Sequence, residues 1–354
     1  MTTLSLTQSC FTTADAASWR KYLPASRSVF GSLEYARICE QFRGATARLH
    51  VVESPTAVIT HPMLLRPVSD LPFAADFDGC WDAVTADYTG PILTGQDDGI
   101  CNEFASHHQA TLRSQGVIAE FAHLHPWSAG VQLLGSNCTF NREIVWVDVS
   151  QPPDFLFTDH FEHACRKNIK RAQKEGVTIS IRDSDGMEDF HSIYISTMAR
   201  NGALDRYHFR REFFQAIQDQ MAHNARFVFA EYAGKVIAAT LYLFDDENVY
   251  SFLGGADASF NHVRPTNLVV WDTIQWAHAT GRKRLVLGSG FRPEDGIYRF
   301  KATFSPLRQK FFTYRNIHRP HDYQLLDSRC RKFHGLGDAD VDYFPSYRVA
   351  GVRG

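Results

Sequence analysis

The segment GIYRFKATFSP places Arg299 and Lys301 on either side of Phe300 in an otherwise apolar stretch. A lysine in such a setting can be a charge directed at a reacting group. A lysine that snorkels from a helix beside a core phenylalanine has the same local sequence. The segment alone therefore allows a catalytic and a structural interpretation of Lys301.

The segment RKNIKRAQK carries five cations in a helical pattern. Spacing of three and four residues places Arg166, Lys170 and Lys174 along one helix face, with Lys167 and Arg171 beside it. Such a face can bind the phosphates of an RNA acceptor stem or an acidic substrate. A solvated helix face, with its cations near the negative end of the helix dipole, is the alternative interpretation.

Other polar groups of the second half are candidates for substrate binding. Arg200 and Tyr207 bracket the segment NGALD and could orient an acceptor amine, although a charge at a helix C-terminus is the alternative for Arg200. Tyr250 and Ser251 alternate along a predicted strand, so one of them is expected to face a pocket. Gly254, the first of a glycine pair, permits close backbone approach to a substrate, although a hairpin turn would use it equally well.

Hydrophobic periodicity predicts alternating helices and strands along most of the chain. The first half is expected to hold a helix over 33–42, two strands at 46–54 and 56–65 joined at Ser54 and Pro55, a helix over 100–114 and a strand at 116–124. The second half is expected to begin with a strand at 142–150 and a helix over 157–176, with Gly176 as its C-cap. A strand, two helices, three antiparallel strands, a helix, a strand, the Phe-Lys segment and a last strand at 308–315 should follow. The segment AGK at 233–235 predicts a hairpin turn between the first two antiparallel strands.

This order predicts an α+β fold with a mixed sheet. We place one domain at 1–145 and a second at 146–316, followed by a tail over 317–354. Both halves open with a helix followed by strands, which makes an internal duplication plausible.

The composition narrows the class of protein. Hydrophobic residues make up 44% of the 354 residues and charged residues 21%, which is typical of a soluble globular protein. The net charge of -2 argues against general affinity for polyanions such as DNA. The longest apolar runs are shorter than the ~20 residues of a membrane span, and the N-terminus does not resemble a signal peptide. Seven isolated cysteines suggest reduced thiols and a cytoplasmic location. The pairs in HLH and HRPH lack metal-ligand spacing with partners, so no metal is expected.

Several segments in a common order resemble the Fem-like branch of the GNAT acyltransferase superfamily, a branch of two-domain aminoacyltransferases. The resemblance runs from about Arg27 to about Arg315, and Ala86 stands where the branch usually has proline. It implies two tandem GNAT-like domains, the second more complete, with Phe300 and Lys301 at the acyl-transfer centre. The lysine would lie near the terminal adenosine of a tRNA and the developing oxyanion. The segments are RKNIKRAQKEGVTI, IYISTMARNG, NVYSFLGGADASFNHVRPTNLVVWDTIQWAHATG, GIYRFKATF, WDAVTADYTGPI and AEFAHLHPW.

The resemblance also bears on the acyl donor. Ordinary GNAT enzymes hold the coenzyme A pyrophosphate in a glycine-rich loop whose amides face the phosphates at a helix N-terminus. Here the corresponding segment is NHVRPTNL, in which Arg264 and Asn267 are the candidate substrate-binding residues. Pro265 removes one amide of the loop, and no glycine is present. Fem-like relatives lack this loop because their donor is an aminoacyl-tRNA.

Three functions follow from these observations. The first is transfer of an amino acid from aminoacyl-tRNA, as co-substrate, to an amine of a small natural-product or peptidoglycan-precursor acceptor, without a bound cofactor. The second is N-acylation from acyl-coenzyme A. The third is a non-catalytic tRNA- or sugar-nucleotide-binding protein on a decayed acyltransferase fold.

Overall fold

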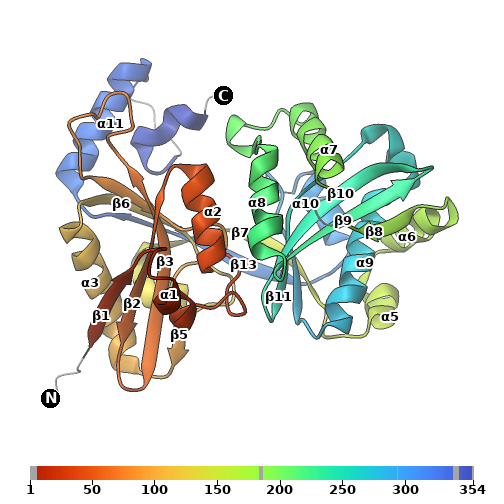
Figure 1. The fold of residues 1–354 in the computed structure, drawn as a ribbon, viewed down its shortest axis with the longest axis horizontal. Helices are drawn as coiled ribbons and strands as arrows, with labels where there is room; N and C mark the ends of the chain where they lie inside the picture. The colour runs from red at the N-terminus through yellow and green to blue at the C-terminus, as the bar shows by residue number, and fades with distance from the viewer. Residues whose placement is uncertain (1–5, 183–185, 293, 338–342, 353–354) are drawn as a thin grey trace. The chain divides into compact units, whose positions relative to one another are not determined.

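The computed structural model describes residues 6–182, 186–292, 294–337 and 343–352 (Figure 1). The chain divides into two compact units. Unit 1 comprises Met1–Asn141 together with Phe311–Gly354, and unit 2 comprises Arg142–Lys310. The predicted ranges 146–316 and 317–354 differ from this division, because the last strand and the C-terminal helix belong to unit 1. Within the described ranges, no helix is both long and apolar enough to cross a membrane.

The sheet of unit 1 has the order β1-β2-β3-β4-β6-β13, and β5 pairs with β3. Only the β4–β6 pair among these is parallel, so the sheet is mixed as predicted. The predicted hairpin at Ser54 and Pro55 joins β2 to β3. The strands are β1 Thr7–Phe11, β2 Thr46–Glu53, β3 Ala57–Pro67, β4 Trp81–Val84, β5 Ile92–Gly95, β6 Val117–His123 and β13 Arg308–Ile317.

Local signals in the sequence explain the main helices of unit 1. Helix α2 begins after Ser32, whose side chain accepts the Tyr35 amide, and ends at Gly44 with φ +58°. Helix α3 begins after Asp97, which accepts two amides of the first turn. Helix α11 packs on β6 and on a C-terminal 3₁₀ helix, which is why the predicted tail is part of this unit. The helices are α1 Ala16–Tyr22, α2 Leu33–Arg43, α3 Asp98–Ser114, α4 Gly130–Leu134, α11 Pro320–His334, and the 3₁₀ helices η1 Gly135–Asn137 and η6 Ser346–Val352.

The sheet of unit 2 has the order β7-β12-β11-β10-β9-β8. The β11–β12 pair is parallel and the others are antiparallel. The predicted hairpin between β9 and β10 turns at Ala233 and Gly234, both with positive φ. The strands are β7 Cys138–Asp148, β8 Thr178–Ile181, β9 Ala225–Tyr232, β10 Lys235–Phe244, β11 Asn248–Ala256 and β12 Arg284–Gly288.

Helices cover both faces of this sheet (Figure 1). On β9, Phe227 lies 5.0 Å between ring centroids from Phe190 of α7, whereas the next residue, Val228, belongs to the core beneath α6 and α9. Because successive strand side chains point to opposite faces, α7 and α8 cover one face and α6 and α9 the other. The helices are α5 Pro153–Phe155, α6 His163–Lys174, α7 Met187–Arg200, α8 Arg211–Met221, α9 Pro265–Ala279 and α10 Gly296–Ala302, with η2 Leu156–His160, η4 Asp205–Tyr207 and η5 Ala258–Val263.

The α+β class, with two tandem units and mixed sheets, is confirmed. One predicted helix is too long, however. The helix expected to end at Gly176 begins only at His163, because a π-helical turn over Leu156–His160 is followed by extended residues. There the amide of Glu162 leaves the helical pattern and donates to the carbonyl of Thr303, 2.9 Å away.

Candidate active site

Lys301 lies near the end of the short helix α10 and is partly buried. Its Nζ donates a hydrogen bond to the carbonyl oxygen of Ser289, 2.7 Å away. Ser289 directly follows β12, which ends at Gly288 with φ +78°. The lysine is therefore directed back at the loop between the strand and the helix. An ammonium group has three N–H donors, and the carbonyl of Ser289 occupies one of them.

Burial lowers the pKa of Lys301 from its ordinary value of 10.5 to about 8, and the nearby Asp295 carboxylate partly opposes this effect. The group is thus still mainly protonated at pH 7. A cation that has lost much of its hydration interacts strongly with a developing negative charge, because few waters screen it. The electrostatics of Lys301 fit the role of an oxyanion stabiliser.

Asp295 organises the loop that precedes α10. Its carboxylate accepts the amides of Phe291, Arg292 and Tyr298 at 2.7, 2.9 and 2.8 Å. Gly290 packs directly on this carboxylate, since a Cβ there would lie 2.0 Å from Oδ1. The sequence interpretation missed Asp295, although an aspartate three residues before the last of these amides is an N-cap signal.

Phe300 has the contacts of a core residue. Its ring lies 5.4 Å from the buried ring of Phe304 in an edge-on arrangement, and it packs against the main core of unit 2. These contacts fix α10 on the unit and so position Lys301. A catalytic role for Phe300 itself stays a prediction.

Helix α6 is amphipathic, as its sequence predicted. Lys170, Arg171 and Lys174 are exposed on it, and the Lys170 ammonium lies 5.7 Å from the ring centroid of Phe157. Arg171 pairs loosely with the following Glu175, with 3.9 Å between Nε and Oε1.

Arg166 differs from the other cations of α6 because its guanidinium donates hydrogen bonds to backbone carbonyls of unit 2. It donates to the carbonyls of Thr158 and Phe161, which precede the helix. The start of α6 is also tied to the end of α10 through the bond from the Glu162 amide to Thr303. The basic helix and the helix that carries Lys301 are therefore direct neighbours.

The two candidate residues in NHVRPTNL, Arg264 and Asn267, lie at the start of α9 and differ in exposure. Arg264 is exposed, has φ +60° and precedes Pro265, the first residue of the helix. Asn267 is 4% exposed, and its Nδ2 lies 3.8 Å from Sγ of Cys165 on α6. Arg264 is thus accessible to a ligand, whereas the side chain of Asn267 joins α9 to α6.

Arg200 and Tyr207 make their contacts at another part of unit 2. Nη1 of Arg200 donates to the carbonyl of Ala256 at the end of β11, 3.0 Å away. The ring of Tyr207 is 37% exposed, and its backbone carbonyl accepts the hydroxyl of Tyr194. Arg200 thus links α7 to β11, and both Arg200 and Tyr207 are exposed.

The two candidates on β11 differ in burial, and the prediction that one of them faces a pocket stays a prediction. Tyr250 is 2% exposed, and its hydroxyl donates to Oδ2 of Asp245 at 3.2 Å. Burial raises the pKa of Asp245 to about 6. Ser251 is half-buried, so it is the more accessible member.

Gly254 and Gly255 lie inside strand β11, so the hairpin-turn alternative is wrong. A Cβ at Gly254 would be 2.7 Å from the carbonyl oxygen of Ala239 on the paired strand. A Cβ at Gly255 would be 2.3 Å from Oγ1 of Thr197 on α7. Helix packing against the strand explains the second glycine.

Residues 160–302 match the family model of the acetyltransferase (GNAT) domain. This range contains the basic helix, the start of α9 and Lys301. Unit 2 therefore carries a GNAT acyltransferase domain, as the sequence resemblance implied. Among curated proteins, none matches the sequence.

The fold of the chain is similar to that of FemX, which confirms the expected Fem-like architecture. The crystal structure of FemX has a TM-score of 0.68 and 14% identity, covering 90% of this chain and 99% of that one. A conserved protein of unknown function from Bacteroides thetaiotaomicron has a TM-score of 0.59 and 11% identity, covering 88% and 99%. The C-terminal domain of a putative lysylphosphatidylglycerol synthetase from Agrobacterium fabrum has a TM-score of 0.57 and 13% identity, covering 90% and 98%.

Proposed function

We propose that this protein transfers an amino acid from aminoacyl-tRNA to an amine of a small natural-product or peptidoglycan-precursor acceptor. The observation that carries the proposal is Lys301, a desolvated cation held by one carbonyl at the end of α10, in a GNAT domain of a chain with the FemX fold. An acyl ester and a free amine are the reactants that such a site serves without a covalent intermediate.

The proposed reaction exchanges an ester for an amide. The acceptor nitrogen attacks the ester carbonyl of the aminoacyl-tRNA, a C–N bond forms, and the carbonyl oxygen becomes an oxyanion. The Lys301 ammonium stabilises that oxyanion. The C–O bond to the terminal ribose then breaks, and the proton lost by the amine passes to the leaving oxygen through the substrate or the neighbouring ribose hydroxyl.

The start of α9 favours tRNA over coenzyme A as the source of the acyl group. A pyrophosphate loop needs several free amides at the helix N-terminus. Here Pro265 supplies none and Asn267 is directed into the core. The exposed cations of α6, next to α10, provide a surface that suits a phosphate backbone instead.

N-acylation from acyl-coenzyme A is the second candidate, and the match of residues 160–302 to an acetyltransferase model favours it. The two donors are distinguished by one experiment. The protein is incubated with a mixture of charged tRNAs or, separately, with acyl-coenzyme A thioesters, each in the presence of a small-molecule cell extract. The proposal predicts protein-dependent loss of the acyl group from tRNA, with formation of an amide product. Loss from the thioesters alone would contradict it.

A variant of α6 makes the donor test sharper. Reversing the charge of Lys170 and Lys174 to glutamate should weaken charged-tRNA binding, and should do so most at low salt, because phosphate contacts release counterions. The same reversal should lower the melting temperature only slightly, because both side chains are exposed and the helix dipole contributes less than about 1 kcal/mol per charge.

A further inference from the structure

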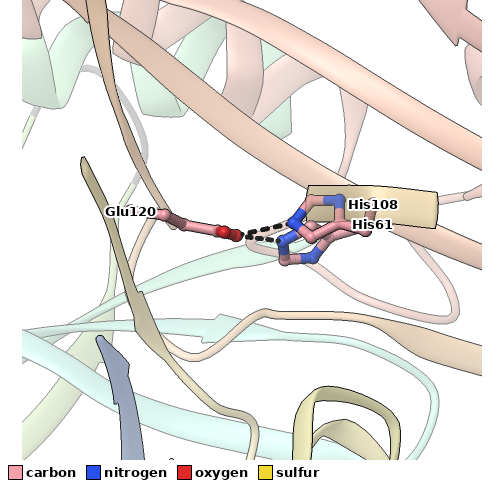
Figure 2. A group of neighbouring side chains, drawn as sticks. All are labelled: His61, His108 and Glu120. Atoms are coloured by element: carbon pink, nitrogen blue, oxygen red, sulfur yellow. Dashed lines mark hydrogen bonds and ion pairs between the residues drawn. The ribbon is translucent and has the colours of Figure 1, made fainter. Parts of the chain in front are cut away.

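Four buried side chains meet in unit 1, outside the proposed transfer site. The Glu120 carboxylate on β6 is 2% exposed and accepts three imidazole N–H groups. Its Oε1 lies 2.8 Å from Nε2 of His108 on α3 and 3.3 Å from Nε2 of His61 on β3 (Figure 2). Its Oε2 lies 3.0 Å from Nε2 of His318, which follows β13. The cluster is thus assembled from four separate segments.

The geometry of three of these groups is that of a metal site. One atom each from His61, His108 and Glu120 can be chosen so that all lie within 4.8 Å of one another. Tetrahedral ligands with bonds of about 2.0–2.1 Å are separated by roughly 3.4 Å. The separations of 2.8 and 3.3 Å from Oε1 therefore need only a small expansion to admit an ion. His318 is hydrogen-bonded to the second carboxylate oxygen of Glu120. It would orient Glu120, as residues that hydrogen-bond to metal ligands do.

A pocket of about 180 Å³ borders this cluster at His108. His108 and His50 both line it, with Cys10 and Phe104 among the other wall residues. Buried polar atoms without partners are rare, yet Nδ1 of His108 and Nε2 of His50 both lack one. The pocket therefore reaches the cluster at one of the three proposed ligands.

We propose that His61, His108 and Glu120 form a binding site for a divalent transition-metal ion, with Zn²⁺ as the reference ion. Two imidazoles and one carboxylate suit zinc and its neighbours better than calcium or magnesium, which prefer oxygen ligands. Each neutral imidazole would move its proton from Nε2 to Nδ1 and give its Nε2 lone pair to the metal. The ion also offsets the charge of a buried carboxylate. A water molecule would take the fourth position.

The sequence predicted no metal because HLH and HRPH lack ligand spacing. His123, His125 and His321 are indeed not part of the cluster, but His318 of HRPH is its fourth member. The site is in unit 1 and does not depend on the function proposed for unit 2.

The site is tested on the full chain, stripped with a chelator and kept under a reductant that does not bind metal. Excess Zn²⁺ is added, unbound ion is removed by gel filtration, and zinc is measured by elemental analysis. We expect about one zinc per chain and a higher melting temperature, since an ion that binds only the native state stabilises it. Less than a tenth of an equivalent, with no change in melting temperature, would overturn the proposal.

Variants distinguish this site from adventitious binding. His108→Gln should lose the zinc, whereas Cys10→Ser and His50→Gln, which alter only the pocket wall, should keep it. Retention of one zinc by His108→Gln would overturn the assignment. If that variant does not fold, the wild type decides, through ¹⁵N-histidine NMR with and without Zn²⁺. Changes at Nε2 of two histidines are expected, and unchanged Nε2 signals would refute the site.

Discussion

Replacing Lys301 by methionine should stabilise the protein at neutral pH while it removes the proposed catalytic cation. Methionine retains a long apolar stem that can fill the same space. It carries no charge, so the cost of keeping an ammonium group partly out of water disappears. The variant therefore separates the stability of unit 2 from the chemistry of the site.

The magnitude follows from the pKa of the lysine. Burial lowers this pKa from 10.5 to about 8 in the folded protein. The difference corresponds to about 3 kcal/mol of destabilisation at pH 7, where the folded and unfolded states both hold the proton. The substitution also removes the hydrogen bond from Nζ to the Ser289 carbonyl, and this loss offsets about 1 kcal/mol of the gain in stability. Lys301→Met is thus expected to be more stable than wild type by about 2 kcal/mol at pH 7.

The pH dependence provides the distinctive signature. Because the folded pKa lies below the unfolded one, the unfolded state binds more protons between pH 8 and pH 10.5, and this group makes wild-type stability rise across that window. The methionine variant lacks this contribution. Its advantage of about 2 kcal/mol should therefore fall by about 3 kcal/mol and become a disadvantage of about 1 kcal/mol as pH approaches 10.5. Other groups that titrate there cancel in the difference between the two proteins.

Urea unfolding of both proteins at several pH values between 7 and 10.5 measures the effect. Lys167→Met on the exposed face of α6 is the matched control, and its difference from wild type should not vary in this way. The reasoning is refuted if Lys301→Met is less stable than wild type at pH 7, or if its stability difference is the same at every pH.

Two further predictions concern the scaffold of the site. Gly255→Ala should destabilise the protein by about 1–3 kcal/mol in urea unfolding, because its Cβ would be 2.3 Å from Thr197 Oγ1. The control is Gly296→Ala, since a Cβ at Gly296 would meet no atom within 4 Å. Equal destabilisation by the two substitutions would contradict the packing argument. Asp295→Ala should lower the free energy of unfolding by about 1–2 kcal/mol, because the N-cap of α10 is lost. It should also speed hydrogen exchange of the Tyr298 amide. Unchanged exchange would show that the cap does not stabilise the helix.

Much of the fold was predictable because it depends on local patterns. The period-2 and period-3.6 patterns located most of the helices and strands, and Gly44 marks the end of α2 as a left-handed cap. The assignment of β13 to unit 1 was not predictable in this way. Its pairing with β6 joins segments nearly two hundred residues apart, and no local pattern specifies such a partner.

The candidate site was predictable to a similar extent. The position of Lys301 beside a core phenylalanine is visible in the sequence, as is the basic face of α6. The acceptor Ser289 is not, because only the folded loop between β12 and α10 brings its carbonyl to Nζ. Glu120 and His318 likewise meet across 198 residues. Functional residues that lie within one helix or strand could be predicted from the sequence. Residues that the folded sheet brings together from distant segments could not.

The central claim is that Lys301 stabilises the transition state of acyl transfer. Its most direct test is the rate of amide formation from charged tRNA by wild type and by Lys301→Met at pH 7, under conditions where both are folded. The loss of one oxyanion donor typically lowers the rate by about 10²–10³-fold, and we expect a loss of that order with the fold intact. Transfer by Lys301→Met at the wild-type rate would contradict the claim.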